Sequence, residues 1–134
     1  PLPSGWRSGA VRRDREVTTN RATFLPQRFD LAVPANRARM DAVEQLAALA
    51  EQAGLTLIQL ALGFVTAHPG VTSALIGPRT PEHLTSQLAA AETVLTNDVL
   101  DAIDEIVAPG TDLAAHEKND APPALLDATL RRRR

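Results

Sequence analysis

The sequence predicts an α/β fold that is mostly helical, and three observations support this. Of the 134 residues 44% are apolar, yet the chain has one Trp, three Phe and no Tyr. Its core must therefore consist mainly of Ala, Leu, Val and Ile, a composition that favours helices. Four segments place apolar residues at helical spacing between residues that start and stop helices. One short run of β-branched and apolar residues predicts a strand.

The composition argues against several classes of function. Fourteen Lys and Arg against sixteen Asp and Glu leave a net charge of −2, so the chain has no global field to attract nucleic acid or an anionic membrane. It has no Cys, which excludes disulfides and thiolate metal sites and fits a reducing cytoplasm. No apolar run reaches membrane-spanning length, and we expect no signal peptide. We therefore expect a cytoplasmic protein without a nucleic-acid or membrane partner.

Residues 1–33 show no sustained periodicity and contain Pro, Gly and six Arg, so we expect a long loop. Loops of this length in a compact domain usually carry function or belong to something missing. The cluster Arg12, Arg13 and Arg15 has two interpretations. It binds a phosphate, or it forms a solvated surface, which is the commoner case.

Residues 35–53 predict an amphipathic helix, which Gly54 ends in a left-handed conformation. The apolar positions share one stripe along this helix. They are Met40, Val43, Ala47 and Ala50, widened by Leu46 and Leu49.

A second helix is expected to follow, because Thr56 and Gln59 have the spacing of a capping box. Apolar residues surround its axis, so we expect it to be buried on most sides. His68, Pro69 and Gly70 stop it. In this interpretation His68 caps carbonyl groups at the helix end and has no catalytic role.

The segment VTSALI, residues 71–76, predicts a buried strand of a parallel sheet. Gly77 and Pro78 break the strand. A helix follows, with Thr80 as its N-cap and Pro81 as its first residue. Its buried face is expected at Leu84 and Leu88.

The predicted strand, the tight turn at Gly77 and Pro78 and the helix start at Thr80 together form a possible anion-binding site. Backbone N–H groups at residues 80–83 point out of the helix N-terminus, where the helix dipole adds partial positive charge. Arg79 offers a guanidinium fork to phosphate oxygens. A second interpretation is almost equally open, in which Thr80 only caps the helix and Arg79 is solvated.

The last predicted helix begins after Thr96 and ends before Pro109 and Gly110. Its buried residues are expected to be Val99, Leu100, Ile103, Ile106 and Val107. Its carboxylates indicate a solvated face rather than a metal site. We expect residues 1–110 to form one domain and residues 111–134, which end in four Arg, to form a polar, flexible tail. A nucleic-acid or localisation tail is the less favoured alternative.

A family resemblance is carried by residues 57–110, which read LIQLALGFVTAHPGVTSALIGPRTPEHLTSQLAAAETVLTNDVLDAIDEIVAPG. They resemble the C-terminal end of the aldo-keto reductases, in the branch that includes the potassium-channel β subunits. The opening PLPSGWRSG resembles the loop after the seventh barrel strand of that family. The resemblance implies the C-terminal part of a (β/α)8 TIM barrel, namely the last one to two βα units plus extra helices. Because the chain begins at Pro1 rather than Met, we also expect it to be the back part of a longer protein.

The resemblance implies an NADP(H) site formed by two groups of residues. The corner and the helix after it would hold the adenosine 2′-phosphate end through Gly77, Arg79, His83 and Gln87, with Arg79 facing the 2′-phosphate. The early loop would lie along the pyrophosphate, with contacts from Pro1, Leu2, Gly5 and Ser8. The chain departs from the family pattern at Ala10, where Lys is common, at Ser86, where Glu is common, and at Gln87, where Asn is common.

The resemblance also implies a reaction, the NADPH-dependent reduction of small-molecule aldehydes and ketones to alcohols. In the family a Tyr donates the proton, assisted by Lys, Asp and His. This chain has no Tyr, and its only Lys is Lys118 in the tail, so we assign it no catalytic residue. The alternative is a helix-turn-helix-like DNA-binding or protein-interaction module over residues 54–84. We disfavour this alternative because its recognition segment offers only Arg79 as a cation.

Overall fold

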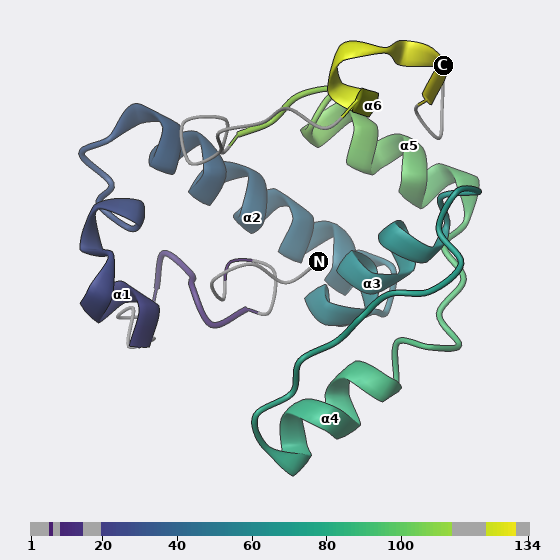
Figure 1. Ribbon diagram of the computed structural model, residues 1–134, viewed down its shortest axis with the longest axis horizontal. Coiled ribbons are helices and arrows are strands. Elements are labelled where there is room, and N and C mark those ends of the chain that lie inside the picture. Colours follow the sequence, from purple (N-terminus) through teal and green to yellow (C-terminus); the bar gives the residue numbers. More distant parts are fainter. Residues whose placement is uncertain (1–5, 7–8, 15–19, 114–122, 131–134) are drawn as a thin grey trace.

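A computed structural model of the chain describes residues 6, 9–14, 20–113 and 123–130 (Figure 1). Within these residues all regular secondary structure is helical. The α-helices are α1 (Asn20–Phe24), α2 (Pro34–Gln52), α3 (Leu57–Thr66), α4 (Pro81–Leu88), α5 (Asn97–Ile106) and α6 (Pro123–Leu126). Two 3-10 helices, η2 (Pro26–Arg28) and η4 (Ala128–Leu130), accompany them.

Helix α2 organises the fold, because it contacts both α3 and α5 (Figure 1). These helices and the segment before α5 enclose the main hydrophobic core, which consists of Ala50, Leu60, Leu95, Leu100 and Ile103. The predicted apolar stripe of α2 is confirmed at Met40, Val43 and Ala50, which are buried. Burying one large aliphatic side chain contributes roughly 1.5–3 kcal/mol relative to leaving it exposed, so this core is the main source of stability.

The junction between α2 and α3 is built as the sequence predicts. Gly54 has a φ of 67°, in the left-handed region that favours glycine. Thr56 and Gln59 form the capping box: the Gln59 N–H donates to Thr56 Oγ1 at 3.2 Å, and the Thr56 N–H donates to Gln59 Oε1 at 2.9 Å. The axes of α2 and α3 differ by 93°. No single helix of the described residues is long and apolar enough to cross a membrane. Taken together, α2 and α3 have the required length and apolar composition, but they are bent against each other.

The N-terminal segment packs on the opposite end of the α2 stripe. Trp6 is only 2% exposed, and Val11 is fully buried. Trp6 and Val11 join Met40 and Val43 in a second apolar cluster, with Phe29 and Leu57 at its edge. The Trp6 and Phe29 rings stack with centroids 5.6 Å apart, and the Arg39 guanidinium lies 5.2 Å from the Trp6 ring centroid. The expectation of one long loop over residues 1–33 is therefore wrong for α1, for η2 and for this buried anchor.

The predicted strand at residues 71–76 is not formed. The structure assigns no regular secondary structure to residues 71–78, and the Leu75 side chain is 90% exposed. A parallel strand needs neighbouring strands to satisfy its N–H and C=O groups, and the described residues provide none.

Helix α4 begins where the sequence predicts but is not buried as predicted. It begins after Thr80 with Pro81 at its first position, as expected, but none of its residues is buried. Leu84 and Leu88, the predicted buried face, are 41% and 55% exposed. An amphipathic stripe indicates which face of a helix prefers burial, but the described part of the chain does not supply a surface to cover it.

His68 follows α3, and its backbone N–H donates to the Val65 carbonyl oxygen of that helix at 3.3 Å. Its Nδ1 accepts a hydrogen bond from the Gly70 N–H at 3.0 Å, and its Nε2 lies 3.4 Å from the Leu130 carbonyl oxygen. A carbonyl group of α3 is therefore capped by the His68 backbone, whereas the His68 ring turns toward the following turn and the C-terminal η4 segment.

Candidate functional site

The corner before α4 has the geometry that the sequence predicts for a helix cap. Thr80 is extended, with φ −134° and ψ 160°, and its Oγ1 accepts the His83 N–H at 3.3 Å. Pro81 follows as the first helical residue. The cap fixes where the α4 N-terminus lies relative to Arg79.

The expected row of N–H groups at residues 80–83 is interrupted. Pro81 has no N–H, and the His83 N–H is bound by Thr80. The nearby Thr80 hydroxyl, followed by the backbone N–H of Glu82 itself, favours the ionised carboxylate and lowers the pKa of Glu82 below its ordinary value. This carboxylate is not among the predicted site residues, although an acidic residue in the first turn of a helix stabilises that end.

Four of the predicted site residues lie on this short stretch of chain. Gly77, Arg79 and His83 are exposed, whereas Gln87 is half-buried. His83 and Gln87 are four residues apart on α4 and therefore share one face of the helix. The other four predicted site residues, Pro1, Leu2, Gly5 and Ser8, lie outside the described residues.

Three features of this stretch bear on ligand binding. A Cβ added at Gly77 would meet no atom within 4 Å, so its backbone can be approached closely. The described residues offer no ion-pair partner to the Arg79 guanidinium. The Oε1 of Gln87 is buried and has no hydrogen-bond partner among them. A buried unpaired acceptor costs free energy, which a donor from a bound ligand would recover.

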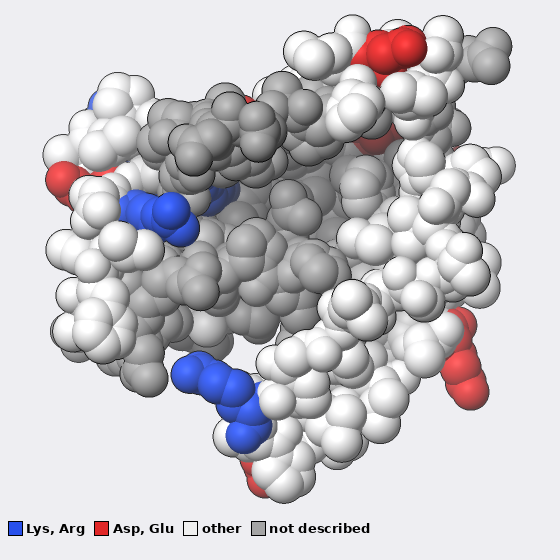
Figure 2. Space-filling model, in the orientation of Figure 1, with Lys and Arg blue, Asp and Glu red and all other residues white. Residues whose placement is uncertain are grey.

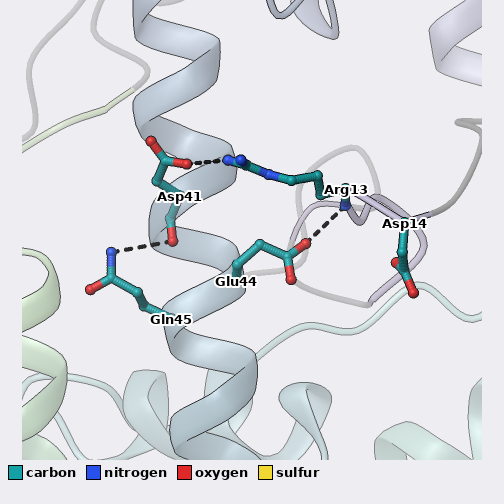
Figure 3. Close-up of a pocket in the computed structure, with 5 residues that line it drawn as sticks. All are labelled: Arg13, Asp14, Asp41, Glu44 and Gln45. Carbon is teal, nitrogen blue, oxygen red and sulfur yellow. Dashed lines mark hydrogen bonds and ion pairs between the residues drawn. The ribbon is translucent and has the colours of Figure 1, made fainter.

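A concave surface lies elsewhere, between the N-terminal segment and α2 (Figure 3). Its lining residues are Arg13, Asp14, Asp41, Glu44 and Gln45. None of them belongs to the predicted cofactor set. The depression is open to solvent, and several of the charged and amide residues that line it bind one another.

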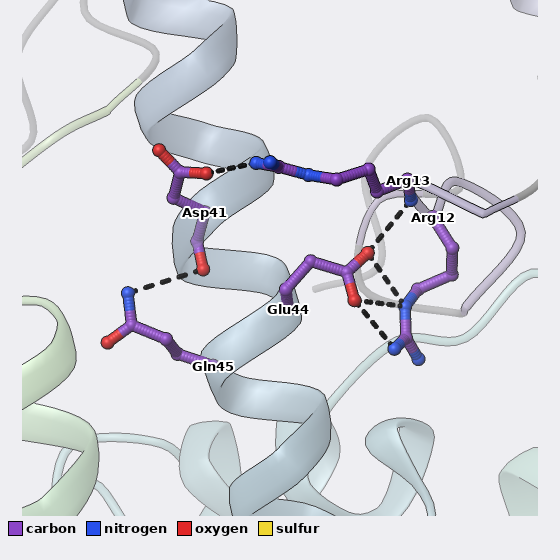
Figure 4. Close-up of polar contacts among 5 residues, drawn as sticks. All are labelled: Arg12, Arg13, Asp41, Glu44 and Gln45. Carbon is purple, nitrogen blue, oxygen red and sulfur yellow. Dashed lines mark hydrogen bonds and ion pairs between the residues drawn. The ribbon is translucent and has the colours of Figure 1, made fainter.

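Ion pairs beside this depression use the cations that the sequence offered to a phosphate (Figure 4). Arg12 Nε lies 3.0 Å from both Glu44 carboxylate oxygens, and Arg12 Nη2 donates to Oε2 at 2.7 Å. The Arg13 N–H donates to Glu44 Oε1 at 2.8 Å, and the Arg13 guanidinium pairs with Asp41.

These contacts decide between the two interpretations of the arginine cluster. The hydrogen bond from Arg12 is the main cause that lowers the pKa of Glu44, and the same bond raises the pKa of Arg12. Arg12 and Arg13 are therefore neutralised by α2 and do not present a phosphate site, while Arg15 lies outside the described residues.

The helix-turn-helix alternative does not agree with the structure. Residues 67–80 separate α3 from α4, whereas the motif joins its helices by a turn of about three to four residues. Among the described residues on the face shown in Figure 2, acidic and basic side chains are scattered and do not form one basic patch.

Two comparisons with known proteins report on the family of this chain. A family model described as the aldo/keto reductase family matches residues 1–108. A protein of Schizosaccharomyces pombe that carries the provisional name voltage-gated potassium channel subunit beta is 33% identical to the chain over 110 residues. The alignment covers 80% of this chain but 32% of the yeast protein, so the chain spans about a third of the length of that relative.

Proposed function

Because the chain belongs to the aldo/keto reductase family, we propose that it supplies the NADP(H)-binding end of an oxidoreductase that reduces small-molecule aldehydes and ketones. The observation that carries this proposal is the exposed Arg79 beside the capped start of α4, within the matched range. In the proposal Arg79 pairs with the 2′-phosphate, and Gly77, His83 and Gln87 contact the adenosine.

The chemistry of Arg79, His83 and Gln87 fits the phosphate and the adenine of adenosine 2′-phosphate. A guanidinium presents several N–H donors in a plane and matches the oxygens of a phosphate. The Gln87 Oε1 is buried without a partner, and if the side chain turns outward it accepts a hydrogen bond from an amino group such as that of adenine. His83, one turn earlier on the same face, provides a planar ring for the base.

The pyrophosphate part of the proposal rests on Pro1, Leu2, Gly5 and Ser8. Their described neighbours Trp6 and Val11 are buried against α2, which supports a loop anchored close to these positions.

We further propose that residues 71–76 form the last strand of a (β/α)8 barrel when the preceding strands are present. This proposal is supported by apolar side chains that are exposed in the 134-residue chain. Leu75 is 90% exposed, and the apolar Leu84 and Leu88 of α4 are also exposed. An apolar run next to an apolar helix face is typical of a βα unit that packs into a barrel.

Catalysis is assigned to residues outside this chain. NADPH supplies a hydride to the carbonyl carbon, and a general acid must protonate the carbonyl oxygen. The chain has no Tyr, and its only Lys is Lys118. We therefore expect the 134-residue chain to bind cofactor weakly and to reduce no aldehyde by itself.

The test compares NADPH and NADH binding to the chain and to Arg79→Ala, followed by amide chemical shifts at residues 77–88. Loss of Arg79 should weaken NADPH by roughly five- to tenfold and leave NADH unchanged, because NADH lacks the 2′-phosphate. Arg37→Ala is the matched control, since Arg37 is an exposed arginine on α2. An equal loss for both cofactors, or the same loss in the control, would remove the assignment of Arg79 to the 2′-phosphate.

A further inference from the structure

One carboxylate of α2, that of Glu44, binds two neighbouring residues of the N-terminal segment (Figure 4). It accepts hydrogen bonds from Arg12 Nε at 3.0 Å and Arg12 Nη2 at 2.7 Å, and its Oε1 also accepts the Arg13 backbone N–H at 2.8 Å. We propose that Glu44 is a positioning residue for the cofactor, because it fixes the chain just after the early loop that would lie along the pyrophosphate. This inference rests on the proposed function.

The contacts of Glu44 constrain both a side chain and the main chain. The Arg12 guanidinium meets both carboxylate oxygens, an arrangement that sets its orientation as well as its distance. The bond from the Arg13 N–H holds the backbone itself, so the path of the segment depends on Glu44. The Arg13 guanidinium pairs with Asp41, one turn earlier on α2, and this ion pair holds the same segment.

Two buried side chains connect these contacts to the early loop. Trp6, within the loop, is 2% exposed and stacks on Phe29, and Val11, just after the loop, is fully buried. Arg12 follows Val11 directly, so its bonds to Glu44 adjoin the second of these anchors. A loop that is ordered before its ligand arrives loses less conformational entropy on binding, so an anchor can raise affinity without touching the ligand.

The sign of the effect separates positioning from direct electrostatics. NADPH and NADH are anions, and a nearby carboxylate repels them. If Glu44 acted only through its charge, or if it kept Arg12 from a phosphate, replacing Glu44 by Gln would strengthen the binding of both cofactors. Positioning has the opposite consequence, because loss of the ion pair loosens the segment and weakens their binding.

The test is Glu44→Gln, which keeps the size of the side chain and removes its charge. The affinities of the 134-residue chain for NADPH and NADH should fall by the same factor, roughly two- to fivefold, because both cofactors carry the pyrophosphate and the ion pair is partly exposed. Adenosine 2′-phosphate, which has no pyrophosphate, should bind the chain and the variant equally. Glu105→Gln is the matched control, because Glu105 is an exposed carboxylate on α5.

A double variant tests whether Glu44 acts through Arg12. Adding Arg12→Gln to Glu44→Gln should cause no further loss of cofactor affinity, because residues that act as a pair are not additive. Additive losses would show that Arg12 acts on the cofactor independently of Glu44, and they would overturn the proposal.

Two further outcomes would overturn the proposal while leaving the proposed function in place, in a protein where Arg79→Ala still weakens NADPH. They are unchanged or stronger cofactor binding by Glu44→Gln, and an equal loss of affinity for adenosine 2′-phosphate, which would indicate a merely structural role. Failure of the proposed function looks different. Neither cofactor, nor adenosine 2′-phosphate, would then shift the amides of residues 77–88 in the unsubstituted chain, and the inference would fall with it.

Discussion

Truncating Trp6 tests whether the N-terminal segment is an integral part of the fold. Trp6 is 2% exposed, stacks on Phe29 and lies under the Arg39 guanidinium. Replacing a buried aromatic residue by Ala costs about 3–5 kcal/mol of unfolding free energy. The Trp6 Nε1 is buried without a hydrogen-bond partner among the described residues, and removing it recovers part of that loss. We therefore expect Trp6→Ala to destabilise the chain by about 3 kcal/mol, the lower end of the range.

A second variant separates the ring from its polar atom. Trp6→Phe keeps an aromatic ring against Phe29 and removes the unpaired N–H, so it should cost less than about 1 kcal/mol. The assay is urea unfolding followed by far-ultraviolet circular dichroism, with Phe24→Ala as the control, because Phe24 is 82% exposed and its loss should change stability by less than about 0.5 kcal/mol. If Trp6→Ala behaved like Phe24→Ala, the packing of the segment on α2 would be refuted.

The remaining predictions concern charge and exposure. Glu44→Gln should cost about 0.5–1 kcal/mol at neutral pH, since the Arg12 ion pair is partly exposed. The pKa of Glu44 is lowered from 4.5, so the stabilisation that Glu44 contributes is present above pH 4.5 and is lost as the pH falls through the lower pKa of the folded state. In thermal unfolding, the melting temperatures of the chain and of Glu44→Gln should therefore converge in acid. A difference in melting temperature that persists in acid would contradict the ion pair. Leu75→Asp should change the free energy of unfolding by less than about 0.5 kcal/mol, because Leu75 is exposed. Leu60→Ala, in the core, should lower it by about 2–5 kcal/mol. Equal losses of unfolding free energy in the urea assay would show that Leu75 is buried.

The helices were predictable because their starts and stops are local. Thr56, Thr80 and Thr96 cap the following helices through bonds to residues three positions on, and each contact is contained within one turn of sequence. Gly54 ends α2 because its left-handed φ suits glycine. Such signals depend on nearest neighbours and need no knowledge of the tertiary structure.

The failures involve partners that are distant in sequence. Arg12 and Glu44 are 32 residues apart, so a run of arginines gave no sign that α2 carboxylates would neutralise two of them. The apolar pattern at residues 71–76 has the composition of a strand, but a strand exists only where another backbone accepts its hydrogen bonds. The exposed Leu84 and Leu88 follow the same rule, since a pattern indicates a preference for burial without providing the surface that buries it.

The aromatic anchor on α2 also makes the chain its own optical probe. Trp6 is the only Trp, so intrinsic tryptophan fluorescence arises from one position, inside the cluster that holds the N-terminal segment. Release of that segment should shift the tryptophan emission to longer wavelength, because the indole then meets water. The other helices carry no Trp and do not contribute to this signal. Reduced nicotinamide absorbs where tryptophan emits, so quenching of this single emitter by energy transfer would report a bound cofactor without any label.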